Sequence, residues 1–156
     1  MKWHAFALLF LFLLCISKIL GALESESRTI LCANLSAFQD LWKDNAYGKD
    51  PNRTEKAAWI VQEKLGRYEF VRWRASDERS RELWHGELPA NVIAQVHTHP
   101  QNSDEKPSTV DRMLAARIRL VIYVISSNGI WSADPAGEVA RVANWDWHKK
   151  LSAECR

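Results

Sequence analysis

The chain has 156 residues, of which 47% are hydrophobic and 26% are charged, with six glycines and five prolines. This length allows one domain with a proper core, and this composition excludes a disordered or fibrous chain. The formal net charge of +2 disappears when residues 1–22 are set aside, because they hold two lysines and no acid and leave 19 basic and 19 acidic residues. Neither nucleic acid nor an anionic membrane is therefore expected as a partner, since either favours a basic surplus.

Residues 1–22 have the pattern of a signal peptide. Lys2 precedes AFALLFLFLLCIS, an apolar run that suits the hydrophobic region of a leader better than a membrane span. Gly21 and Ala22 then supply small residues near a cleavage point. We expect an exported protein, either secreted or periplasmic. The alternative is an uncleaved N-terminal anchor, because Leu20 fits the small-residue cleavage pattern poorly.

The next segment predicts a helix and then a pair of strands. Residues 35–42 carry leucine, phenylalanine and tryptophan at helical spacing, and Gly48 is a natural stop. KAAWIVQ (56–62) and YEFVRWRA (68–75) have the composition of two strands joined by a short connection. A charged connector separates them from a third apolar strand at 91–99.

The remaining elements alternate between helix and strand. Residues 108–120 carry apolar side chains at helical spacing, 121–126 form a dense β-branched run, and a turn leads into a strand at 130–133. The tail, 138–156, is ambiguous between a short strand and a closing helix. These elements predict an α/β fold: a single domain with a mixed β-sheet flanked by helices. We divide the chain into a leader (1–22), an N-terminal helical segment (23–54) and the main domain (55–156).

Two cysteines remain after the leader, Cys32 and Cys155, one near each end. In an exported protein such a pair favours a disulfide that ties the two ends together. The alternative is two free thiols. No C-x-x-C spacing indicates a thiolate metal site.

Two histidines stand at the end of the third strand. Residues i and i+2 of a strand point to the same face, so His97 and His99 project together while Thr98 faces the other way. Pro100 cannot continue a central strand, so the strand should end there. Two imidazoles at a strand end are an ordinary start for a zinc site.

Ser108 and Asp111 open the helix that follows. Ser108 comes after a proline and fits a helix N-cap, which places Asp111 in the first turn with its carboxylate free to lean back toward the strand. Two histidines and one aspartate leave the fourth position of a tetrahedral zinc site open, as in catalytic rather than structural sites. Ser108 and Asp111 also fit a capping box by themselves, and both interpretations can hold together.

This stretch carries a resemblance to a known family. From His97 to Asp111 the chain reads H-x-H-P-x(7)-S-x-x-D, which is the signature of the JAMM/MPN+ (JAB1/Mov34) zinc metallopeptidases. An upstream glutamate of the family resembles Glu55 in TEKAAWIVQ, although Ala58 stands where the family usually has glycine. The resemblance covers roughly residues 55–131 and implies an MPN/JAB-like fold.

The resemblance also implies a role for each residue. His97, His99 and Asp111 would hold one Zn²⁺ per chain. Glu55 would be the general base for a zinc-activated water, and Ser108 would steady the oxyanion. The implied activity is hydrolysis of a peptide or isopeptide bond, with a peptide or isopeptide-linked protein as the substrate.

Several alternatives stay open. Glu63 or Glu69, near the same strands, could replace Glu55 as the base. The chain could also be a catalytically silent MPN-like module that binds metal or protein in the cell envelope, although all the ligands are present. A zinc deaminase is excluded, because the histidine pair reads HTH rather than H-x-E and no P-C-x-x-C follows. His85 and His148 lack partners at metal spacing and are expected at the surface or an edge.

Overall fold

The protein is described here from a computed structural model, which covers residues 26–49, 54–74, 82 and 84–155. The expected leader, residues 1–22, lies outside the described part. Within that part, no helix is both long and apolar enough to cross a membrane. The elements in chain order are a helix over residues 26–33, α2 (Leu35–Asp44), η1 (Ala46–Gly48), β1 (Ala57–Gln62), η2 (Lys64–Gly66), β2 (Tyr68–Arg72), β3 (Val92–Thr98), α3 (Thr109–Ile118), β4 (Val121–Ser126), β5 (Gly129–Ala133), β6 (Val139–Asn144) and α4 (Trp147–Glu154).

The six strands form one sheet in the order β2-β1-β3-β4-β5-β6. Only the β3–β4 pair is parallel, and α3 makes the connection between these two strands. The prediction of an α/β fold with a mixed sheet is therefore confirmed. The ambiguous tail contains both of the proposed elements, since β6 completes the sheet edge and α4 closes the chain.

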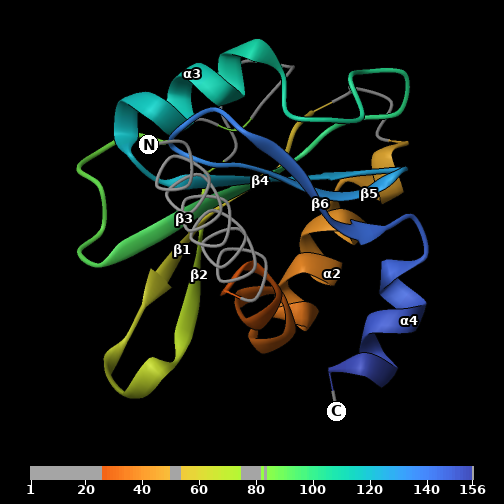
Figure 1. Ribbon diagram of the computed structural model, residues 1–156, viewed down its shortest axis with the longest axis horizontal. Helices are drawn as coiled ribbons and strands as arrows, with labels where there is room; N and C mark the ends of the chain where they lie inside the picture. The colour runs from red at the N-terminus through yellow and green to blue at the C-terminus, as the bar shows by residue number, and fades with distance from the viewer. Residues whose placement is uncertain (1–25, 50–53, 75–81, 83, 156) are drawn as a thin grey trace, which may run out of the picture.

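The helices cover the two faces of the sheet unequally, as Figure 1 shows with α3 on one side and α2 and α4 on the other. The larger core lies on the α2 and α4 side. It buries Phe38 and Trp147 against Ile60, Val96 and Tyr123 of three neighbouring strands. Each large side chain fully buried there contributes roughly 1.5–3 kcal/mol of apolar burial. Because α2 shares this core, the described part of the N-terminal helical segment belongs to the same domain as the sheet.

The smaller core lies under α3. Ala115 of α3 packs with Ile122 and Val124 of β4 and with Ala133 of β5. Only one residue of α3 is fully buried, whereas Val110 and Met113 on its outer side are 68% exposed. The helix therefore contacts the sheet through only a narrow strip of its surface.

Cys32 and Cys155 form a disulfide, with their Cα atoms 5.2 Å apart. This is the pairing expected from the sequence. Leu31 and Leu151, from the same two helices, are buried in the larger core. The bond therefore ties the first and last described helices together on the side of the sheet opposite α3.

Candidate metal centre

The two histidines lie where β3 ends, on the face of the sheet that α3 covers. In the sheet register, His97 stands between Ala57 of β1 and Val124 of β4. Val124 belongs to the core under α3, so the His97 side chain points to that side. Both histidines are buried, with 5% of each residue exposed. The small Ala57 side chain beside His97 leaves space at this position.

The third residue of the group comes from the first turn of α3. Ser108 is the N-cap, and its Oγ accepts a hydrogen bond from the backbone N–H of Asp111 at 3.2 Å. In return, the N–H and the Oγ of Ser108 donate to Asp111 Oδ2, each at 2.7 Å. The expected N-cap and capping box are therefore confirmed. These bonds occupy Oδ2 and aim the carboxylate back toward β3.

The donor atoms of His97, His99 and Asp111 lie within 4.8 Å of one another, the only such group of three among the described residues. The two histidine Nε2 atoms are 3.1 Å apart. Asp111 Oδ1 lies 3.4 Å from His97 Nε2, and Oδ2 lies 3.7 Å from His99 Nε2. A tetrahedral ion with bonds of about 2.0–2.1 Å separates its ligand atoms by roughly 3.4 Å. The group can therefore hold a metal ion with little rearrangement.

The protonation states of the group also fit a metal site. The pKa of His97 is lowered to about 4, mainly by burial; Asp111 opposes this change and the neighbouring His99 adds to it. For Asp111, burial raises the pKa. His97 and the hydrogen bonds from Ser108 outweigh burial, and the pKa ends below its usual value. At neutral pH, His97 is therefore neutral and Asp111 is ionised, as metal ligands must be.

The Nδ1 atoms, the ring nitrogens that do not face the other members of the group, have different surroundings in the two histidines. His99 Nδ1 lies 2.5 Å from the backbone carbonyl oxygen of Asp104, so this nitrogen carries the proton and leaves Nε2 free to bind a metal. His97 Nδ1 is buried with no hydrogen-bond partner. Most metal-binding histidines donate this outer N–H to an acceptor. His99 is therefore the better oriented of the two ligands.

Glu55 lies at the same end of the sheet as the group but is not one of its three residues. Glu55 stands two residues before Ala57, which pairs with His97 in the sheet. Its side chain therefore shares the face of the sheet on which the histidines lie. Glu55 is half-buried at an isolated bridge just before β1. The structure thus places Glu55 at the same strand end as the histidines, outside the group of three candidate ligands.

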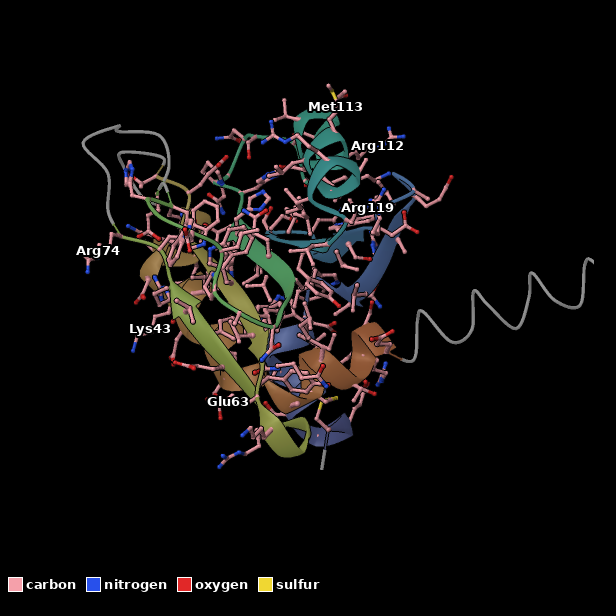
Figure 2. All side chains as sticks on the ribbon, turned by 90° about the vertical axis from the view of Figure 1, so that its left-hand side faces the viewer. Lys43, Glu63, Arg74, Arg112, Met113 and Arg119 are labelled. Atoms are coloured by element: carbon pink, nitrogen blue, oxygen red, sulfur yellow. A yellow bond between two sulfur atoms is a disulfide. The ribbon has the colours of Figure 1, made fainter. Side chains whose placement is uncertain are left out.

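The two alternative glutamates lie at the opposite end of the sheet. Glu69 pairs with Val61 near the end of β1, four residues beyond Ala57. Glu63 follows β1, forms an ion pair with Arg67 at 3.6 Å and lies far from α3, as Figure 2 shows. At about 3.3 Å per residue, both are more than about 10 Å from the histidines along the strand. This geometry favours Glu55.

Solvent approaches the site from the α3 side. Two hollows flank the loop that leads from β3 to α3, one of about 380 Å³ beside Pro100 and Ser126 and one of about 620 Å³ beside Ser108 and Arg112. The histidines are nearly closed off, whereas 14% of the Asp111 side chain is exposed. The most exposed part of the group is therefore the Asp111 carboxylate at the N-terminal end of α3.

Some residues around the site could not be selected from the sequence. Glu82 is buried beside the start of β1, although it stands in a connector crowded with charges. The role of Asp104 depends on its backbone carbonyl, which no side-chain pattern reveals. His85 and His148 are exposed and lie outside the metal-binding group, as expected.

Comparison of the chain with family models, with curated proteins and with solved structures returned no match. The assignment of a function therefore depends on the chemistry of the site.

Proposed function

We propose that the protein is a zinc-dependent hydrolase of the JAMM type, which cleaves a peptide or isopeptide bond. The observation that carries the proposal is the convergence of His97, His99 and Asp111 within the H-x-H-P-x(7)-S-x-x-D spacing. Two imidazoles and one carboxylate also suit iron(II). The reason for proposing zinc is the JAMM-type spacing of these residues along the chain.

Each side chain has a defined task in this proposal. Zinc, when bound, supplies a Lewis acid that activates water near neutral pH. Glu55 takes the proton and passes it to the leaving amine, as a general base followed by a general acid. Asp111 stays ionised because His97 and the two hydrogen bonds from Ser108 together outweigh the effect of burial on its pKa. The hydroxyl of Ser108 is engaged with Asp111, so it must rotate before it can donate to an oxyanion.

The disulfide supports export as part of the proposal, because such bonds persist in oxidising compartments. The substrate would then be a peptide or a cross-linked peptide outside the cytosol. Net neutrality after the leader agrees with a substrate class that is not selected by charge.

The test compares the wild type with Glu55→Gln and with Glu63→Gln as the matched control. The metal content of each protein is measured first, and each is then assayed on peptides, cross-linked peptides and peptidoglycan fragments. Glu55→Gln should keep its metal and lose hydrolysis, because glutamine keeps the shape of the side chain and cannot take the proton. Glu63→Gln should behave as wild type.

Two outcomes would contradict the proposal. Turnover at the wild-type rate in Glu55→Gln would show that Glu55 is not the general base. A metal-loaded wild type that cleaves nothing on the panel but binds one component tightly would favour the silent binding module.

A further inference from the structure

Glu82 is a buried carboxylate that the proposed chemistry does not use. It is 6% exposed. Its Oε2 accepts a hydrogen bond from the backbone N–H of Ala57 at 3.0 Å, and its Oε1 lies 3.4 Å from Lys56 Nζ. Its own backbone N–H donates to the carbonyl of Glu55 at 2.9 Å. One residue therefore contacts three consecutive residues at the start of β1.

These contacts lie beside β1 at positions beyond the end of β2. Trp73, just beyond the end of β2, still donates to the carbonyl of Ala57 at 2.9 Å. The N–H of Ala57 has the Glu82 carboxylate as its acceptor, in place of a backbone carbonyl. Glu82 thus continues the ladder on the β2 side of β1 after β2 has ended.

The other side of the same segment is held by β3. Lys56 N–H donates to Thr98 Oγ1, and Thr98 N–H donates to the carbonyl of Lys56, both at 2.9 Å. Thr98 lies between the two histidines in sequence. The segment from Glu55 to Ala57 is therefore fixed on one side to the strand that carries the histidines and on the other side to Glu82.

We infer that Glu82 is a positioning residue, which holds the backbone of Glu55 so that its carboxylate faces the group formed by His97, His99 and Asp111. The inference rests on the proposed function, because it assumes that Glu55 is the base. Glu82 suits this task because a charged acceptor makes a stronger hydrogen bond than a neutral one, and Lys56 balances its buried charge.

The first arm of the test examines the contact itself in the metal-free full chain. Amide hydrogen exchange is followed by NMR in wild type, Glu82→Ala, Glu82→Gln and, as a control, Glu87→Gln, an exposed glutamate of the same connector. Exchange at Ala57 should become at least about tenfold faster in Glu82→Ala. Glu82→Gln keeps an acceptor and should show a smaller change. If exchange at Ala57 is unchanged in both Glu82 variants, the inference is wrong.

The second arm separates positioning from a purely structural role. The chain is loaded with cobalt(II), and its visible absorption is titrated with pH in wild type, Glu55→Gln, Glu82→Ala and Glu82→Gln. We expect Glu82→Ala to shift the pH midpoint of the absorption change in the same direction as Glu55→Gln does, by a smaller amount. The ratio of cobalt to protein should stay unchanged. The midpoint for Glu82→Gln should lie between those for Glu82→Ala and wild type. If Glu82→Ala does not fold, Glu82→Gln alone provides the test.

The outcomes distinguish the inference from the proposed function. A midpoint that moves in Glu55→Gln but not in the Glu82 variants would overturn the inference and leave the proposed function intact. A wild type that takes up neither cobalt nor zinc would overturn both.

Discussion

Ser108 and Asp111 bind each other in both directions, because each backbone N–H donates to the side chain of the other residue. The same bonds cap α3 and orient a carboxylate of the metal-binding group. Oδ2 of Asp111 receives both bonds from Ser108, and Oδ1 faces His97 at 3.4 Å. The stability of the helix end and the geometry of the candidate metal centre therefore depend on the same pair of residues.

Ser108→Ala should affect stability and metal binding together. Loss of the cap should lower the free energy of unfolding by about 1 kcal/mol. Loss of the bond that orients Asp111 should weaken zinc binding by about 10–100-fold. Chemical denaturation and competition with a chelator measure the two effects. Thr109→Ala, at the exposed neighbouring hydroxyl, is the control, and equal zinc affinity in Ser108→Ala and the control would contradict the prediction.

Removal of a ligand should abolish stoichiometric metal binding. The wild type, expressed with zinc available, should carry about one zinc per chain, and His97→Ala and Asp111→Ala should carry almost none, because each removes one of three protein ligands. Elemental analysis by mass spectrometry measures the ratio. His148→Ala, at an exposed histidine outside the group, should keep its zinc. A zinc-free wild type would disprove the site.

The metal-free protein should lose stability as the pH falls from about 6.5 to 4. The pKa of His97 is about 4 in the folded chain against 6.5 without burial. In this window the unfolded chain binds a proton that the folded chain does not, so the free energy of unfolding falls as the pH falls. The whole difference corresponds to roughly 3 kcal/mol. Melting temperatures at pH 7 and pH 4.5 should differ more for wild type than for His97→Gln, and parallel changes would contradict the assignment.

Removal of the disulfide should destabilise the fold without emptying the site. The bond links residues 123 positions apart, so it restricts the unfolded chain strongly. The double variant Cys32→Ser/Cys155→Ser should lose about 2–4 kcal/mol of unfolding free energy. Its zinc content should stay near one, because the ligands lie on the opposite face of the sheet. Denaturation with and without a reductant checks the first part, and identical curves for wild type would contradict it.

Much of the fold could be predicted from the sequence, because local signals were clear. The β-branched run 121–126 and the apolar strand 92–98 are β4 and β3, and the proline after His99 marks the strand end. Ser108 was identifiable as an N-cap from its place before an amphipathic segment. The tail was ambiguous because two short elements are separated by only two residues, Trp145 and Asp146.

Other parts of the site depend on contacts that no local pattern encodes. Glu82 stands in SDERSREL, where several charges are equivalent until the fold selects one of them for burial. The choice among Glu55, Glu63 and Glu69 required the register of β1 against β3, which the sequence does not specify beyond the alternation of side chains.

The connection between the parallel strands β3 and β4 has a consequence for the order in which the site assembles during folding. His97 and Asp111, the outermost of the three candidate ligands, are separated by only 14 positions within the unit formed by β3, α3 and β4, whereas 42 positions separate Glu55 from His97. Closing the longer loop costs roughly 1 kcal/mol more chain entropy. In a folding chain, His97, His99 and Asp111 can therefore come together before β1 docks and adds Glu55 to this end of the sheet.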